Sequence, residues 1–186
     1  MTFGDPMEFD YVIVGAGSAG CVLASRLSEN GRYRVLLLEA GPRDRYPWLH
    51  IPIGYAKTMF HPKYNWRYYT EPDPGMNGRS IYWPRGKVLG GSSAINGLIY
   101  VRGQPEDYEH WAALGNPGWS WQEVLPYFIR AERNERGQDH FHGASGPQGV
   151  SDVGDPNTLA RAFIDACVEA GYPANPDFNG ESQEGA

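Results

Sequence analysis

The stretch Gly15-Ala16-Gly17-Ser18-Ala19-Gly20 decides the fold of this chain. A run of apolar residues at 11–14 precedes the glycines, and helical spacing through Ala24 and Leu27 follows them. A second expected strand then occupies residues 34–39, with apolar residues at 35–38. Strand, glycine turn, helix and strand in this order predict one βαβ unit, which is the start of a doubly wound, Rossmann-like α/β fold.

The three glycines of the turn have different expected uses. Gly15 permits a tight turn, Gly17 lets a pyrophosphate approach the backbone, and Gly20 lets the helix pack on the strand. The N–H groups at the helix start favour an anion without any Lys or Arg. Glu39, 19 residues after Gly20, can accept hydrogen bonds from both ribose hydroxyls and would repel a 2′-phosphate. The pattern predicts a site for FAD or NAD, and a strand-turn-helix without any ligand is the alternative.

Composition narrows the classes of function. The 186 residues carry a net charge of −6 without any block of Lys or Arg, so no nucleic-acid partner is expected. The two cysteines, Cys21 and Cys167, predict neither a disulfide framework nor a metal site. No segment approaches the ~18 apolar residues of a membrane span, and residues 1–10 do not resemble a secretory signal. We therefore expect a cytoplasmic protein, with peripheral attachment to the inner membrane as the alternative.

Downstream of residue 41 the periodic pattern is lost. Residues 42–84 are rich in proline and aromatic residues, which predicts a long extended excursion that serves as a lid or covers a cofactor. Helical spacing returns at residues 105–114 and 121–133. The second of these helices is preceded by Ser120, with Glu123 three residues later, which predicts a capping box.

The last fifth of the chain combines a loop and a helix. Residues 136–148 are polar and rich in glycine, which predicts an exposed loop. Residues 157–171 have helical spacing, and Gly171 is the expected stop. We expect the inward face of this helix to consist of Leu159, Phe163, Ile164 and Cys167.

A second glycine-rich stretch occupies residues 84–97 and reads PRGKVLGGSSAING. Its four glycines, two serines and one asparagine predict a turn before a helix start, with backbone donors, hydroxyls and an amide close together. Taken alone, a glycine-rich linker explains this stretch equally well.

Together, the two glycine-rich stretches resemble the glucose-methanol-choline (GMC) oxidoreductase family, and the resemblance runs along almost the whole chain. The matching segments are residues 10–20, 38–42, 65–66, 70–72 and 85–103. Residues 142–147 and 171–180 are most similar to the choline-dehydrogenase-type branch of that family.

The resemblance implies a flavoprotein that binds FAD and oxidises an alcohol by hydride transfer to the flavin. It places the pyrophosphate at Gly15, Gly17, Ser18, Ala19 and Gly20, and the adenosine ribose at Glu39 with Ala40 beside it. It places the isoalloxazine along Arg85, Val88, Gly91, Ser92, Asn96, Gly97, Leu98 and Ile99, where backbone donors would stabilise the charge of the reduced ring. Some relatives attach FAD through a histidine immediately before the matching asparagine. Ile95 in this position predicts non-covalent FAD.

The resemblance also predicts a division of the chain. Residues 8–157 would be the N-terminal part of an FAD-binding domain, including the excursion 42–84 and the flavin loop 85–103. Residues 158–186 would begin a substrate or cap region. Because two strands do not complete a doubly wound sheet, we expect the rest of the same polypeptide, or a second chain, as a partner. The substrate would be a small-molecule alcohol such as choline. The catalytic histidine of the family would lie beyond Ala186, so no catalytic residue is assigned.

Other interpretations fit the same sequence. Relatives on this scaffold also perform fatty-acid photodecarboxylation or hydroxynitrile cleavage, and a non-catalytic FAD-binding subunit or an NAD-dependent dehydrogenase are further alternatives. His140 and His142 suggest a metal pair, but without a third ligand nearby we expect solvated loop histidines and no metal. Trp66, Tyr68 and Tyr69 could cover the flavin, although packing is the commoner fate of such residues.

Overall fold

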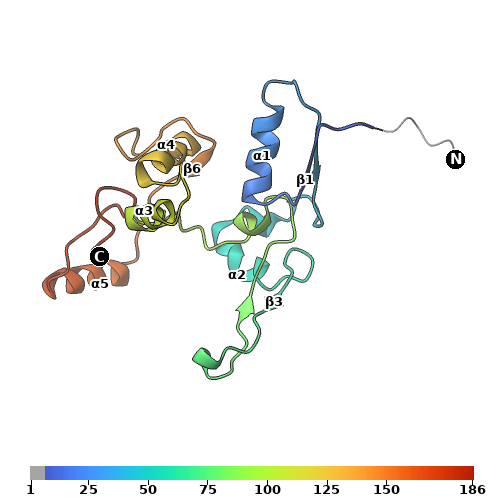
Figure 1. Cartoon of the computed structure of the whole chain (residues 1–186). Helices are drawn as coiled ribbons and strands as arrows, with labels where there is room; N and C mark the ends of the chain where they lie inside the picture. The colour runs from blue at the N-terminus through green and yellow to red at the C-terminus, as the bar shows by residue number, and fades with distance from the viewer. Residues whose placement is uncertain (1–6) are drawn as a thin grey trace. The chain divides into compact units, whose positions relative to one another are not determined.

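The computed structural model describes residues 7–186, which divide into two compact units, residues 7–99 and residues 100–186 (Figure 1). Most of the N-terminal stretch that is expected to lack a secretory signal lies outside the described residues. Within residues 7–186, no helix has the length and apolar character needed to cross a membrane. The units divide at residue 99 by their internal contacts, and the division between cofactor and substrate regions at residue 157 stays a prediction.

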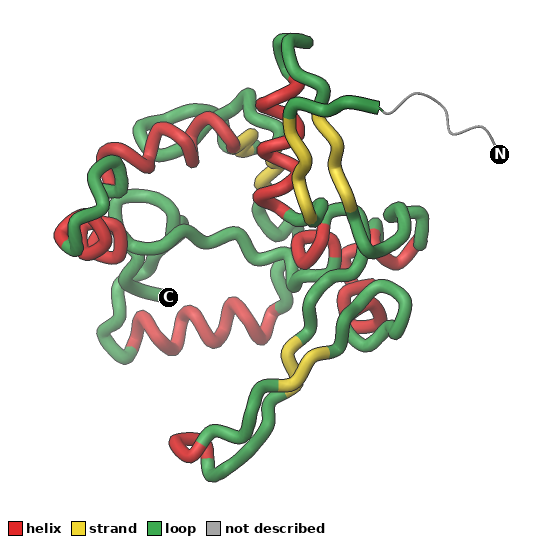
Figure 2. The backbone as a smooth tube through the Cα atoms, turned by 45° about the vertical axis from the view of Figure 1, so that its right-hand side comes forward, coloured by secondary structure: helices red, strands yellow, loops and turns green. Residues whose placement is uncertain are grey.

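The first unit begins with the predicted βαβ unit, which the structure confirms. Strand β1 (Tyr11–Val14) leads into helix α1 (Ser18–Ser28), and strand β2 (Val35–Leu38) follows. The two strands pair in parallel, side by side in Figure 2. This is the right arrangement for two strands joined by a helix, because a parallel pair needs such a crossover.

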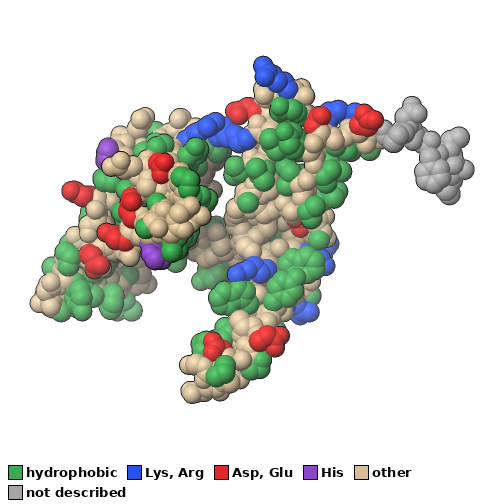
Figure 3. All heavy atoms as spheres, in the orientation of Figure 1, with side chains coloured by type: hydrophobic (Ala, Val, Ile, Leu, Met, Phe, Trp, Pro, Cys, Tyr) green, Lys and Arg blue, Asp and Glu red, His purple; other side chains and the backbone are tan. Residues whose placement is uncertain are grey.

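The sheet of this βαβ unit is only partly covered. Val12 is 56% exposed and Val14 is 83% exposed. Hydrophobic side chains accordingly lie at the surface around β1 in Figure 3. Strands of a doubly wound sheet are normally buried on both faces, so the described residues form an incomplete sheet, as predicted.

The excursion at residues 42–84 contains short elements only. Residues 65–86 form an antiparallel hairpin that projects from the rest of this unit in Figure 2, and we call this segment the hairpin. Its strands pair Tyr68 with Trp83, and further bridges join Asn65 to Gly86 and Asp73 to Arg79. The elements of the excursion are η1 (Pro47–Leu49), η2 (Pro52–Gly54), α2 (Tyr55–Thr58), β3 (Tyr68–Tyr69), η3 (Pro74–Met76) and β4 (Tyr82–Trp83), and η4 (Gly91–Ala94) follows in the flavin loop.

The second unit begins with two helices, α3 (Pro105–Ala113) and α4 (Trp121–Ala131), which confirm the two predicted helices. Tyr108 is buried between them, and its ring lies 5.9 Å from that of Phe128. The predicted capping box is present: the Ser120 backbone N–H donates to Glu123 Oε2 at 3.1 Å. The hydrogen bond from the Ser120 hydroxyl, and after it the one from the Ser120 backbone N–H, lowers the pKa of the Glu123 carboxyl.

After α4 the chain is extended in β5 (Glu132–Asn134), which pairs in parallel with β6 (Gln148–Val150). The prediction of an exposed loop at residues 136–148 is wrong in part, because His142, Gly143 and Gly146 are buried. A Cβ atom at Gly143 would overlap the carbonyl oxygen of Ile129. The glycines of this loop therefore allow close packing on the end of α4.

Helix α5 (Thr158–Glu169) confirms the predicted last helix, and its stop is also confirmed, because Gly171 has φ +97°. The predicted inward face is wrong for residues 7–186. Leu159 is 79% exposed, Phe163 69% and Ile164 42%, and Cys167 is half-buried. The predicted helical period is correct, but this face has no apolar partner within the described residues.

Candidate cofactor-binding site

The turn between β1 and α1 has the geometry that its glycines predict. Gly15 has φ +93°, a conformation that residues with a Cβ rarely adopt. A Cβ at Gly20 would overlap the carbonyl oxygen of Gly15, so the helix packs directly on the turn. Gly17 has no atom within 4 Å of the place where its Cβ would be. The turn is thus closed on its inner side at Gly20 and open at Gly17, where a pyrophosphate is expected.

Glu39 ties the end of β2 to this turn. Its Oε2 atom accepts from the backbone N–H of Ala16 at 2.8 Å, and its Oε1 atom accepts from the backbone N–H of Gly41 at 2.8 Å. A carboxylate has about four acceptor positions, so these two bonds leave capacity for ribose hydroxyls. The two backbone bonds hold the carboxylate in a fixed orientation beside the turn.

The second glycine-rich stretch packs on the first. A Cβ at Gly91 would lie 2.7 Å from the Cα of Gly17, and the Gly90 backbone N–H donates to the Ala16 carbonyl at 2.8 Å. The hydroxyls of Ser18 and Ser93 are 3.0 Å apart. The alternative of a free glycine-rich linker is therefore wrong, because this stretch is a fixed wall of the turn.

Close backbone contacts also fix the residues that lead into this glycine-rich stretch. Val88 is fully buried, and the Leu89 N–H donates to the Pro42 carbonyl at 3.0 Å. A Cβ at Gly41 would overlap the backbone of Lys87. The chain just after β2 and the chain just before Gly91 are thus in direct contact.

These segments enclose a groove of about 670 Å³. We call it the dinucleotide groove. Its lining includes seven of the predicted site residues: Gly15, Gly17, Glu39, Ala40, Arg85, Gly91 and Ser92. It also includes residues that the sequence did not assign to the site, namely Val14, Leu38, Trp66, Tyr68 and Gly86. The proximity of Trp66 and Tyr68 to the glycines depends on the hairpin, so only their aromatic character was a signal in the sequence.

Eight predicted site residues do not line the groove. Ser18 and Ala19 are exposed at the start of α1, whereas Gly20 and Val88 are buried. Asn96 and Leu98 border a smaller hollow of about 90 Å³, with Trp48 and His50 among its other residues. Gly97 and Ile99 are exposed. The flavin-side assignments at residues 96–99 stay predictions.

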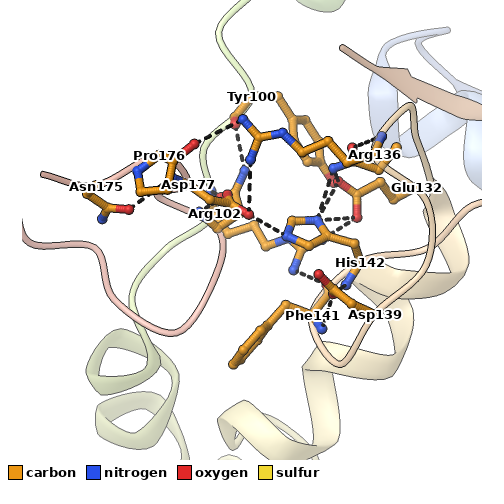
Figure 4. A network of polar contacts seen from close by, with 12 residues as sticks. Tyr100, Arg102, Glu132, Arg136, Asp139, Phe141, His142, Asn175, Pro176 and Asp177 are labelled. Atoms are coloured by element: carbon orange, nitrogen blue, oxygen red, sulfur yellow. Dashed lines mark hydrogen bonds and ion pairs between the residues drawn. The ribbon is translucent and has the colours of Figure 1, made fainter. Parts of the chain in front are cut away.

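The second unit contains a network of buried charges (Figure 4). Arg102 Nη2 and Glu132 Oε2 are 2.7 Å apart, and both side chains are almost fully buried. His142 Nδ1 lies 3.1 Å from Glu132 Oε2, and His142 Nε2 lies 2.8 Å from Asp177 Oδ2. Figure 4 shows the imidazole ring between these two carboxylates. The prediction of a solvated loop histidine is wrong for His142, which is 3% exposed.

Two exposed acids beside this network have altered pKa values. Burial raises the pKa of Asp139, but backbone N–H groups of Phe141 and His142 lower it more, so the net direction is downward. The hydrogen bonds from Arg136 lower the pKa of Asp152, and the same contact raises the pKa of Arg136. The lowered pKa values keep both acids ionised to a lower pH than an ordinary aspartate. The network ties residues 175–183 to the rest of the second unit, and it does not line the dinucleotide groove.

Comparisons with known proteins agree with this geometry. A family model described as GMC oxidoreductase matches residues 9–186. The oxygen-dependent choline dehydrogenase of Photobacterium profundum is 51% identical over 179 residues, which cover 95% of this chain and 32% of that protein. Among solved structures, pyridoxine 4-oxidase from Mesorbium loti has a TM-score of 0.84 at 40% identity, covering 89% of this chain and 33% of the other. An FAD-dependent oxidoreductase from Chaetomium thermophilum has a TM-score of 0.79 at 35% identity, covering 91% and 31%.

These comparisons confirm the predicted incomplete α/β fold and the predicted resemblance, including its choline-dehydrogenase-type branch. The chain spans about a third of the length of the relatives that it matches.

Proposed function

The chain belongs to the GMC oxidoreductase family, and we propose that it forms the cofactor-binding part of an FAD-dependent enzyme that oxidises a small alcohol to an aldehyde. The observation that carries the proposal is the close approach of Gly91 to Gly17, 74 residues away in the sequence. This contact joins two glycine-rich stretches into the wall of one groove, with an open backbone position for a pyrophosphate and a carboxylate for a ribose.

The residues present fit a dinucleotide. The first N–H groups of a helix have no partners within the helix, and at the start of α1 they stand beside the open position at Gly17. Glu39 would accept hydrogen bonds from the ribose, with Ala40 beside it, and Arg85 adds a positive charge to the groove lining. A diphosphate would thus meet backbone donors and a guanidinium.

When bound, FAD supplies the acceptor for the hydride that leaves the alcohol carbon. This chain would hold and orient the cofactor, and the flavin loop at residues 85–103 would offer backbone donors to the reduced ring. The proton of the alcohol would be accepted by a base outside this chain. The substrate would be a primary alcohol, choline or a similar small molecule.

The supporting experiment uses the purified protein that contains this chain. We expect flavin absorption bands, and we expect an anaerobic panel of choline and simple primary alcohols to bleach them as the flavin is reduced. A yellow protein that no alcohol bleaches would contradict alcohol oxidation and leave another reaction on the same scaffold. A colourless protein that binds no FAD would contradict the whole proposal.

The proposal includes a dissociable flavin. Ile95 occupies the position of the histidine that tethers FAD in some relatives, and its side chain is buried and carries no nucleophile. Acid denaturation should therefore release all the yellow colour into the supernatant. A denatured protein whose mass includes FAD would show a covalent link through some other residue.

The partner and the location follow from the same proposal. The remainder of the enzyme, as the rest of the polypeptide or as a second chain, would complete the sheet beside β1 and supply the catalytic base. We place the enzyme in the cytoplasm or on the inner membrane surface, since neither Cys21 nor Cys167 is engaged in a disulfide. Cell fractionation followed by detection of the flavoprotein tests this placement.

A further inference from the structure

We propose that Trp66 and Tyr68 form an aromatic wall of the dinucleotide groove, against which a planar ring of the bound dinucleotide stacks. This inference rests on the proposed function, because it assigns a contact within the same FAD site. It concerns two residues of the hairpin, a segment outside the glycine-rich stretches that identify the site.

Both aromatic rings are exposed in the groove. Trp66 is 40% exposed and Tyr68 is 50% exposed, and both line the dinucleotide groove together with Gly17 and Glu39. Large aromatic side chains gain most when they are buried, so two of them exposed side by side in this groove offer a surface that a ligand ring can cover. Tyr69, the next residue, is 67% exposed and does not line this groove.

The two rings lie parallel to each other. Their planes differ by 6°, and their centroids are 5.9 Å apart, which is an offset stack. The ammonium group of Lys87 lies 4.3 Å from the centroid of the Trp66 indole and holds it by a cation–π contact. A flat ring entering the groove would extend the stack, while Arg85 adds positive charge to the same lining.

The backbone presets this arrangement. Arg67, between the two aromatic residues, has φ +57°, an uncommon conformation for a residue with a Cβ. Asn65 is 2% exposed, and its Oδ1 atom accepts from the backbone N–H groups of Arg67 at 2.8 Å and of Arg85 at 3.0 Å. A buried amide thus holds a strained turn and joins it to the flavin loop. Such strain is commonly retained where it orients residues of a functional site.

The contact predicts a selective loss of cofactor affinity. Base stacking on an aromatic side chain changes affinity by about tenfold or more, so Trp66→Leu should weaken FAD binding at least tenfold. Trp66→Phe keeps a flat ring and should stay within about threefold of the unchanged protein. Tyr69→Leu is the matched control, because it removes an exposed aromatic ring from the same hairpin outside the groove, and it should leave the affinity unchanged.

The experiment measures the dissociation constant of FAD for flavin-depleted protein that contains this chain, using the fluorescence of the flavin and of tryptophan. The same titration with ADP and with riboflavin identifies which ring stacks, because only the probe that carries that ring should lose affinity in Trp66→Leu. Thermal unfolding of each variant without flavin separates a binding defect from a folding defect.

Equal FAD affinity of Trp66→Leu and the unchanged protein would overturn the aromatic wall. An equal loss of affinity in Tyr69→Leu would also overturn it, because the effect would then reflect the hairpin as a whole. If the unchanged protein binds no FAD, the proposed function fails instead, so the two failures are distinguishable. A selective loss in Trp66→Leu with retention in Trp66→Phe supports the wall.

Discussion

The interiors of the two units are stabilised by different kinds of contact. In residues 7–99 the closest packing is backbone against backbone, with glycine at each meeting point: Gly20 on the turn, Gly41 on the chain at Lys87, and Gly91 on Gly17. In residues 100–186 the centre is a buried ion pair, Arg102 with Glu132, extended by His142. The first unit therefore should not tolerate added side-chain atoms at these glycines, and the second should not tolerate loss of a charge.

Removing one member of the buried ion pair is the strongest test of this contrast. Arg102→Met leaves the Glu132 carboxylate, which is 0% exposed, without its guanidinium. The unfolding free energy should fall by about 3–5 kcal/mol, because an uncompensated charge stays buried. Urea unfolding of the purified protein that contains this chain measures the change.

The control for the ion pair lies in the first unit. Arg26 and Glu29 form a pair at 3.1 Å whose side chains are 39% and 60% exposed. Arg26→Met should cost less than about 1 kcal/mol, because exposed pairs contribute little. A similar loss of unfolding free energy in Arg102→Met and Arg26→Met would contradict the special role of the buried ion pair.

Adding one methyl group at a backbone contact tests the other half of the contrast. Gly91→Ala places a Cβ against the Cα of Gly17 at a residue with φ +58°, so both packing and backbone conformation are strained. We expect a loss of stability of about 1–3 kcal/mol and a loss of FAD affinity, measured by thermal unfolding and flavin titration.

Gly97→Ala is the matched control for that substitution. Nothing lies within 4 Å of its Cβ position, and its φ is not positive. The stability change should remain within about 0.5 kcal/mol. Because Gly97 is itself a predicted flavin contact, only stability is compared, and equal stability of Gly91→Ala and Gly97→Ala would show that the contact of Gly91 with Gly17 is not tightly packed.

Removing the N-cap of α4 should destabilise the second unit by a smaller amount. Ser120→Ala removes the hydroxyl of the capping box, and the expected cost is about 1 kcal/mol. Ser120→Asp keeps an acceptor at the cap and should recover most of the stability. Thermal unfolding of both variants is the measurement, and an Ala variant as stable as the Asp variant would contradict a role for the cap.

The smallest expected effect is a pH dependence confined to the second unit. The pKa of Asp152 is lowered below its ordinary 3.8 by hydrogen bonds from Arg136, so this contact stabilises the folded state above that pH. The stabilisation is lost as the pH falls through the lowered pKa, because the carboxyl is then protonated in both states. Asp152→Asn should lower the melting temperature slightly near about pH 6, and the difference should shrink as the pH falls below 3.8. A difference that is constant over this range would contradict the assignment.

The sequence predicts the βαβ unit and the helices well because their signals are local. The spacing of Gly15, Gly17 and Gly20 and the capping box at Ser120 each depend on residues within one or two turns. The second glycine-rich stretch was assigned through family resemblance, since its contact with Gly17 spans 74 residues and leaves no periodic pattern.

The buried charges were missed for a related reason. Glu132 and His142 are residue types that are usually exposed, and their partners lie as far away as Asp177. Two buried glycines, Gly143 and Gly146, were the available signal, because glycines in a polar segment can mark close backbone packing as well as a loop. On α5 the period was read correctly, but whether a face is covered depends on the partner rather than on the helix.

The bridge between Asn65 and Gly86 closes the base of the hairpin, which should let its tip accept an insertion. Everything that positions the aromatic wall lies at the closed base of the hairpin, while its tip turns at Asn77 and Gly78, both with positive φ. Lengthening a loop whose ends are already held together costs only about 0.6 kcal/mol per doubling. Neither tip residue lines the dinucleotide groove, so the tip is a suitable insertion point for a peptide tag or a fluorescent label.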